Sequence, residues 1–242
     1  GRPGGSATQR PSASAAESAI QRAVDAKQYM FLFFVRTDDE ATQAARKTLE
    51  AAMPKLADRA KSVAVNITDP KEKALIKKYE LARAPMPLLL AVASNGAVTE
   101  GFSLKFTEAQ LETAFVSPGM QKCLKALQDR KMAFICVQNS TTLHNSEAMK
   151  GVKEFVANAQ YAKTTEIINI DPTDAAEESL LKQFKVDPKT NEAVTVFLAP
   201  PGTTVGTYKG ETKKDVLIAA VKTAAKGCVP GSSCCPAPKK KS

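Results

Sequence analysis

The chain has 242 residues, of which 43% are hydrophobic and 24% charged, with a net charge of +9 and no tryptophan. This length suits two domains of about 100–120 residues, and the hydrophobic content supplies a core for each. No apolar run approaches the roughly 20 residues that a membrane-spanning helix needs, so we expect a soluble protein without a membrane span.

The positive charge is not gathered in one stripe. The tail from Lys226 onward carries +4 and the first eighteen residues carry +1, which leaves +4 spread over mixtures of Lys and Glu. A nucleic-acid surface would need a concentrated basic stripe and, for single strands, exposed aromatic side chains on which bases stack. Nucleic acid is therefore not an expected partner.

The first domain is expected to span residues 16–117, after a flexible Gly/Ser/Ala/Pro leader at 1–15. No signal peptide is expected, and the leader is interpreted as a linker or a remnant of processing. Met30 to Val35 is apolar throughout, as in a strand buried on both faces, and Asn95-Gly96 is a hairpin turn signal. Pro54 is expected to kink or restart its helix. The predicted elements are helix 16–27, strand 30–35, helix 39–53, strand 62–66, helix 69–79, strands 87–93 and 98–102, and helix 107–114.

Ser117-Pro118-Gly119 is typical of a linker, and the same order of elements begins again after it. The second domain is expected at 118–226, followed by a Cys/Lys/Pro-rich tail at 227–242. Its predicted elements are helix 120–130, strand 132–137, helix 146–159, strand 165–169, helix 174–184, strands 194–198 and 205–208, and helix 213–225.

The repetition is visible in residues as well as in pattern. Residues 65–81 are similar to residues 168–186, with an offset that grows from 103 at Asn66 and Asn169 to 105 at Tyr79 and Phe184. Such a drift is what one loop insertion would produce, so the sequence indicates a duplicated domain.

The element order resembles the thioredoxin fold. The stretch from Tyr79 to Leu90, followed by Asn95-Gly96, is similar to that family's segment around its cis-proline. The resemblance implies an α/β architecture of two tandem thioredoxin-like domains, each a central mixed β-sheet flanked by helices. It also implies that Pro85 is the cis-proline, with Pro87 as the alternative, beside a backbone edge along which an extended peptide can lie.

The family's redox chemistry needs two cysteines one turn apart at a helix N-terminus, where the helix dipole lowers the thiol pKa. The corresponding places are residues 39–42 (Asp-Glu-Ala-Thr) in the first domain and about 141–144 (Thr-Thr-Leu-His) in the second. Neither domain is therefore expected to be a dithiol oxidoreductase. Residues 191–194 (Asn-Glu-Ala-Val) stand before the third strand of the second domain without a proline, which puts its peptide-binding edge in doubt.

The five cysteines fall into two groups. Cys123 and Cys136 are expected to be small apolar core residues. The tail residues Cys228, Cys234 and Cys235 leave three possibilities open: a disulfide from Cys228 to one of its two partners, a soft metal ion such as Cu(I) or Zn(II), or thiol exchange. A bond between the two adjacent cysteines would be strained, since neighbouring α-carbons are about 3.8 Å apart. This cysteine usage fits an oxidising compartment, periplasmic or secreted.

These observations favour a non-catalytic binding or scaffold protein that holds a protein or peptide partner. The groove is expected between Arg36, Asp38 and Asp39 on one side and Ala84, Pro85 and Met86 on the other. The alternative is a thiol- or soft-metal-handling protein that acts through its tail cysteines, and a third reading is a structural component without a groove. No cofactor is expected apart from a soft metal ion at the tail. His144, the only histidine, is expected to face solvent at a helix start.

Overall fold

The computed structural model describes residues 14–226, without the side chains of residues 225 and 226, and residues 1–13 and 227–242 lie outside the described part. The chain divides between Phe115 and Val116 into two compact units. Within residues 14–226 no helix is long and apolar enough to cross a membrane.

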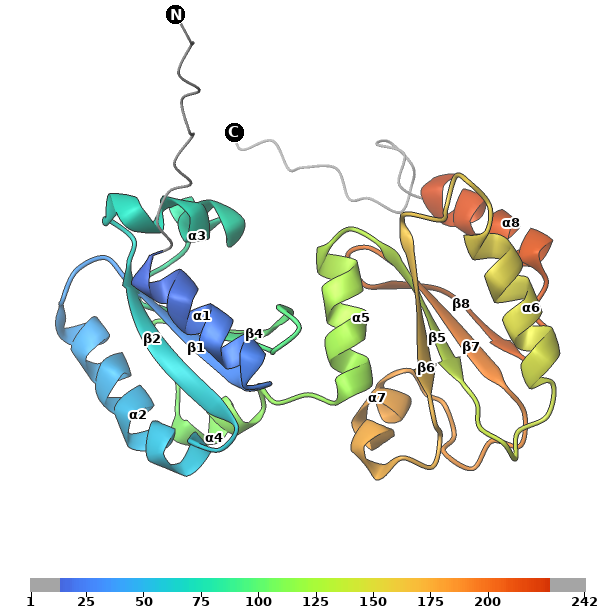
Figure 1. Ribbon diagram of the computed structural model, residues 1–242, viewed down its shortest axis with the longest axis horizontal. Coiled ribbons are helices and arrows are strands. Elements are labelled where there is room, and N and C mark those ends of the chain that lie inside the picture. The colour runs from blue at the N-terminus through green and yellow to red at the C-terminus, as the bar shows by residue number, and fades with distance from the viewer. Residues whose placement is uncertain (1–13, 227–242) are drawn as a thin grey trace, which may run out of the picture. The chain divides into compact units, whose positions relative to one another are not determined.

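The first domain is a mixed four-stranded sheet flanked by helices (Figure 1). The strand order is β2-β1-β3-β4, with β2 parallel to β1, and β3 antiparallel to both β1 and β4. Its elements are α1 (Ala15–Asp25), β1 (Tyr29–Val35), α2 (Glu40–Leu56), β2 (Ala60–Asn66), the 3-10 turn η1 (Pro70–Glu72), α3 (Lys73–Lys78), the 3-10 turn η2 (Leu81–Arg83), β3 (Leu88–Val92), β4 (Val98–Ser103) and α4 (Glu108–Glu112).

The second domain repeats this plan with the strand order β6-β5-β7-β8 (Figure 1). Strand β6 is parallel to β5, and β7 is antiparallel to both β5 and β8. Its elements are α5 (Pro118–Gln128), β5 (Met132–Val137), α6 (Asn145–Val156), β6 (Thr165–Ile170), the 3-10 turn η3 (Ala175–Glu177), α7 (Glu178–Gln183), β7 (Val194–Ala199), β8 (Thr203–Lys209) and α8 (Lys214–Lys226). The predicted α/β class and the mixed sheet in each half are confirmed.

The central strands have helices on both faces because their side chains are apolar on both faces. In the first domain, Met30, Leu32 and Phe34 of β1 pack in one cluster with residues of α1 and α3. The guanidinium of Arg46, on α2, lies 5.7 Å from the ring centre of Phe33, which points to the other face.

The same two-sided burial holds in the second domain. Ala133, Ile135 and Val137 of β5 pack with α5 and α7. The alternate residues Phe134 and Cys136 pack with α6 and α8. The uninterrupted apolar run of each central strand is therefore explained by burial on both sides of its sheet.

Helix α2 continues through Pro54 to Leu56, so the expected restart is wrong, and a kink at Pro54 stays a prediction. A proline lacks only the amide that would bond to the carbonyl four residues earlier, here that of Glu50. Glu50 and Pro54 are both exposed, so water can satisfy that carbonyl. The buried side chains of Ala52 and Leu56 hold the last turns of the helix against the domain.

The offset between matching residues of the two domains is constant from residue 66 to residue 79, whereas the sequence predicts that it grows over this stretch. The Oδ1 of Asn66 accepts from the amide of Thr68, and the Oδ1 of Asp171 accepts from the amide of Thr173, both at 2.9 Å. These matching turns equate Asn66 with Asp171, at the same offset of 105 that relates Tyr79 to Phe184. The pairing of Asn66 with Asn169 is therefore wrong, because Asn66 is the last residue of β2 and accepts the turn bond, whereas Asn169 lies within β6, two residues before the matching acceptor Asp171.

Each domain buries a glutamate against the start of its first helix. The Ser14 hydroxyl, the N-cap of α1, donates to Oε2 of Glu72 at 2.9 Å. In the second domain the amide of Gly119, in the first turn of α5, donates to Oε1 of Glu177 at 2.7 Å. A carboxylate in this place interacts favourably with the positive end of the helix dipole and with amides that lack intrahelical partners.

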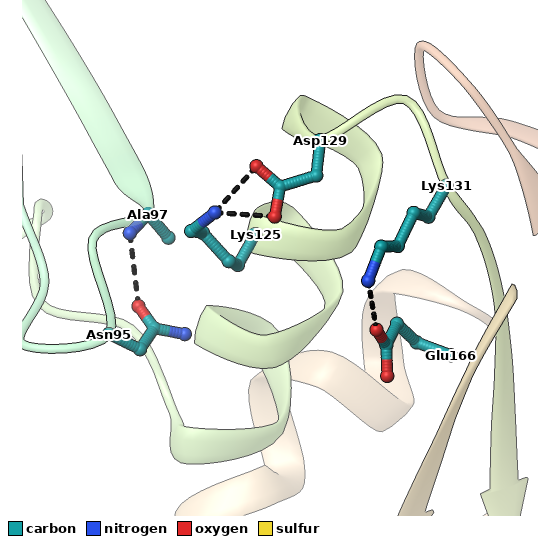
Figure 2. A network of polar contacts seen from close by, with 6 residues as sticks. All are labelled: Asn95, Ala97, Lys125, Asp129, Lys131 and Glu166. Carbon is teal, nitrogen blue, oxygen red and sulfur yellow. Dashed lines mark hydrogen bonds and ion pairs between the residues drawn. The ribbon is translucent and has the colours of Figure 1, made fainter. Parts of the chain in front are cut away.

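Figure 2 shows short polar contacts within each domain, at a turn, along a helix and between neighbouring strands. In the first domain, the Oδ1 of Asn95 accepts from the amide of Ala97 at 3.0 Å and closes the β3–β4 turn, where Gly96 has a φ of 83°. The predicted Asn-Gly hairpin is confirmed. In the second domain, ion pairs join Lys125 to Asp129 along α5, and Lys131 to Glu166 between the ends of β5 and β6.

Helices α6 and α8 can approach closely because α6 carries a glycine where the chain leading into α8 crosses it. A Cβ added at Gly151 would lie 1.6 Å from the backbone oxygen of Thr212. The backbone itself would therefore have to move to admit any side chain at this position.

We expect Gly151→Ala to destabilise the second domain by about 1–3 kcal/mol, because an added atom in a packed contact forces the backbone apart. Urea denaturation followed by circular dichroism measures the loss. Gly101→Ala is the matched control, since its new Cβ would meet only the end of the Leu90 side chain, at 3.3 Å. Equal effects of the two substitutions would contradict the close approach at α6.

We expect Glu177→Ala to cost about 1–3 kcal/mol, because it leaves the buried Gly119 amide without its acceptor. The neighbouring exposed residue provides the control, and Glu178→Ala should stay within about 0.5 kcal/mol of the parent. Denaturant midpoints of the full chain report both values, and an unchanged midpoint for Glu177→Ala would refute the role given to the carboxylate.

Candidate functional site

The start of α2 carries a carboxylate where a dithiol protein has its first sulfur. Asp39 is the N-cap, and its Oδ1 accepts from the amide of Thr42 at 2.9 Å. The Thr37 hydroxyl donates to Oδ2 at 2.9 Å. The bond from the Thr42 amide and the bond from Thr37 lower the pKa of Asp39 below its ordinary value. This helix start therefore presents a fixed negative charge to solvent.

The remaining predicted residues on this side of the groove are also exposed. Asp38 pairs with Arg46 of α2 at 3.5 Å, and its backbone oxygen accepts from the side-chain amide of Gln43. Arg36, directly after β1, is exposed. The loop from β1 to α2 thus carries Asp38 in an ion pair, Asp39 as the helix N-cap, and Arg36 exposed to solvent.

The other side of the predicted groove is the segment that leads into β3. Phe34 of β1 pairs with Leu88 of β3, so the chain after β1 and the chain before β3 lie at the same end of the sheet. The six predicted site residues therefore fall at one sheet end. No hydrogen bond or ion pair joins the Arg36–Asp39 loop to residues 84–86 within the described chain.

The cis peptide bond of this segment joins Met86 to Pro87, so the assignment of the cis position to Pro85 is wrong and the alternative holds. Pro87 is buried at the entry to β3, and its carbonyl accepts from the amide of Leu104 at 2.8 Å. Pro85 is exposed two residues earlier. The sequence could not separate the two prolines, because only sheet pairing shows which of them borders the strand.

The main-chain groups of Met86 have no hydrogen-bond partner in the described chain. Neither its N–H nor its C=O makes a hydrogen bond within residues 14–226, whereas the Ala84 amide donates to Leu81 at 3.1 Å. The Met86 side chain is half-buried and packs against the apolar cluster that contains Leu75 and Leu81. A donor and an acceptor on one anchored residue can pair with an extended chain, as in the addition of a strand to a sheet.

The corresponding places in the second domain differ in detail from the prediction. Helix α6 begins at Asn145 with the exposed His144 as its N-cap, at a φ of 61°. The residues that match 39–42 are therefore 144–147, three positions later than the predicted 141–144. His144 does face solvent at a helix start, as expected.

The segment before β7 is hydrogen-bonded to its own domain. The Leu143 amide donates to the Asn191 carbonyl at 2.8 Å, and the Ala193 amide donates to the Leu143 carbonyl at 2.9 Å. The other cis bond in residues 14–226, Pro200–Pro201, lies in the β7–β8 turn and not at the entry to β7. Sequence reasoning missed this pairing, which involves only main-chain groups.

The cysteines in the described chain are buried. Cys123 on α5 is 1% exposed and Cys136 on β5 is 2% exposed, as expected for core residues. Burial raises the pKa of Cys123 to about 11 and that of Cys136 to about 12. Cys228, Cys234 and Cys235 lie outside the described residues. Within residues 14–226, no group of three or more His, Cys, Asp or Glu side chains could hold a metal ion.

No protein-family model and no curated protein matches the chain. Solved structures do match, at low identity. The germline-specific thioredoxin Deadhead of Drosophila melanogaster is 16% identical over 43% of this chain and 93% of that chain, with a TM-score of 0.33. The first two thioredoxin domains of Saccharomyces cerevisiae Eps1p are 8% identical over 88% and 98%, with a TM-score of 0.32. Human ERp44 is 10% identical over 95% and 61%, with a TM-score of 0.37.

The sheet order and strand directions decide the fold in each half of the chain. A parallel pair from the first half of the unit, joined to an antiparallel hairpin from the second half, occurs twice with helices on both faces. Both domains have the thioredoxin-like fold. Neither thioredoxin-like domain has a cysteine at the start of its second helix, where α2 begins with Glu40 and α6 with Asn145.

The two buried thiols should be nearly inert in the native protein, because the reactive thiolate is scarce when the pKa is raised. At pH 8 we expect iodoacetamide to modify Cys123 and Cys136 roughly 100-fold or more slowly than in the urea-unfolded chain. Peptide mapping by mass spectrometry separates them from the tail cysteines. Rapid modification of either residue in folded protein would contradict the burial described here.

Proposed function

We propose that the chain holds an extended polypeptide along the main chain of Met86 in the first domain, without exchanging disulfides with it. The observation that carries this proposal is that the N–H and C=O of Met86, beside the exposed Pro85, have no hydrogen-bond partner within residues 14–226. Main-chain bonds of this kind accept many partner sequences, because every non-proline residue offers the same donor and acceptor.

The anchoring of Met86 supports its role as a docking edge. Its side chain rests on the cluster that contains Leu75 and Leu81, and Pro87 behind it is buried. A binding group that is already held in position loses little conformational freedom when a partner arrives, so more of the interaction free energy appears as affinity.

The loop across the sheet end supports a non-catalytic role. Asp39 caps α2 with a carboxylate, which occupies the positive helix end that would otherwise stabilise a thiolate. The cysteines of the described chain are buried and far less acidic than a reactive thiol. Arg36 and the acidic residues beside it would contact a partner at the rim of the groove.

Fluorescence anisotropy with a labelled, unfolded and cysteine-free peptide of about 15 residues tests the proposal. We expect Met86→Ala to weaken binding about 10-fold, because it removes the side chain that anchors the docking edge. Val24→Ala is the control, since Val24 is exposed on α1 at the other end of β1 and should leave binding unchanged.

Two results would contradict the proposal. One is the absence of binding by the parent chain, and the other is an equal effect of Met86→Ala and Val24→Ala.

Deletion of residues 227–242 separates the proposal from the alternative of a cysteine-based tail function. Peptide binding should survive the deletion, because the groove lies entirely in the first domain.

A further inference from the structure

The two domains place corresponding residues at the entry to their third strands. The Pro87 carbonyl accepts from Leu104 at 2.8 Å, and the Ala193 carbonyl accepts from Gly210 at the same distance. These bonds equate Pro87 with Ala193, and therefore Met86 with Glu192. Two residues before Met86 and Glu192, Ala84 and Thr190 match as well, since the amide of each donates to the carbonyl three positions earlier.

The Thr190 hydroxyl makes hydrogen bonds with both main-chain groups of Glu192. Thr190 Oγ1 donates to the Glu192 carbonyl at 2.8 Å and accepts from the Glu192 amide at 3.3 Å. In the first domain the matching residue is Ala84, which has no hydroxyl. The Met86 groups that correspond to those of Glu192 make no hydrogen bond in the described chain.

A second internal contact lies beside the first. Leu143 pairs in parallel with the segment around Glu192, through its amide to Asn191 and its carbonyl to Ala193. The latter bond needs an N–H at the position of Ala193. Its counterpart Pro87 has none, so the first domain cannot make this second bond.

The loop that carries Leu143 is held by its own side chains. The amide of Asn139 donates to Thr142 Oγ1 at 2.9 Å, and that hydroxyl lies 2.7 Å from Oδ1 of Asn145. The Asn145 side-chain amide donates to the Asn139 carbonyl at 2.6 Å. Thr142 is only 7% exposed, so this network fixes the loop from within the domain.

We infer that the second domain is closed to partners by its own chain. Thr190 bonds the main-chain groups of Glu192, which match those of Met86. Leu143 bonds the main-chain groups of the residues on either side of Glu192. The protein then engages one extended polypeptide per molecule, through Met86 alone. This inference rests on the proposed function for the site of the peptide, but the closure of the second domain is independent of it. A partner would have to displace Thr190 and Leu143. These residues belong to the same chain as the edge, so their effective concentration beside it is always high.

Hydrogen exchange of the full chain, read by nuclear magnetic resonance, tests the closure without any ligand. Relative to the rate of each residue in an unfolded chain, the Leu143 and Ala193 amides should exchange roughly 100-fold or more slowly than the Met86 amide. Comparable protection at Met86 and Ala193 would overturn the inference.

The double variant Thr142→Val/Thr190→Val removes both hydroxyls while keeping the side-chain volume, and Thr142→Ser/Thr190→Ser is the matched control that keeps them. In the valine variant we expect exchange of Leu143 and Ala193 to rise about 10-fold or more, because the loop and the Glu192 main chain lose their partners. The serine variant should behave as the parent.

The same cysteine-free peptide then reports which edges are open. The parent should bind one peptide and show added protection at Met86 only, whereas the valine variant should bind a second peptide with protection at 191–193. Protection of both domains in the parent would overturn the inference, as would a valine variant that gains fast exchange but no second peptide.

If no protein binds peptide, the proposed function fails, and the exchange data alone decide whether the second domain is closed. If the valine variant does not fold, the exchange rates of the parent still decide.

Discussion

A main-chain N–H or C=O at the entry to a sheet must find a partner in its own chain, in water or in another molecule. The two domains meet this requirement in opposite ways at the same place in their fold. In the second domain a hydroxyl and a neighbouring loop satisfy the groups around Glu192. In the first domain the groups of Met86 are left for a molecule outside the described chain. The difference follows from two positions, Ala84 against Thr190 and Pro87 against Ala193.

The rest of each domain is built on the same plan. The central strands are buried on both faces, and each first helix is fixed by a buried glutamate at its start. These features recur in both halves, together with paired residues of positive φ such as Lys27 and Arg130 after the first helices. The sheet and its buried central strand are therefore common to both domains, while the entry to the third strand is one of the places where the two domains differ.

At the sheet end where the second helix begins, the described residues offer charged side chains and main-chain hydrogen-bonding groups. Asp39 brings a carboxylate to the start of α2, where thioredoxin-like enzymes of the dithiol type need sulfur. The thiols of Cys123 and Cys136 are held in the core, where burial disfavours their charged form. A site of this kind can hold a chain and orient it, and this is the role proposed for the first domain.

The sequence by itself determined the duplication, the order of the elements and which residues stand at the starts of α2 and α6. These follow from local composition and periodicity, such as the apolar run of Met30 to Val35 and the residues that begin α2 and α6. Only the tertiary structure decided which proline borders the third strand, how the two halves align at Asn66 and Asp171, and whether the edge of each domain is free. The place of the proline and the pairing of Leu143 depend on hydrogen bonds between main-chain groups far apart in the sequence, and nearly every residue carries such groups, so local sequence does not reveal them. The alignment at Asn66 and Asp171 and the Thr190 contact depend instead on side-chain oxygens that bond main-chain groups two residues away, and the sequence does not show which of its many polar side chains do so.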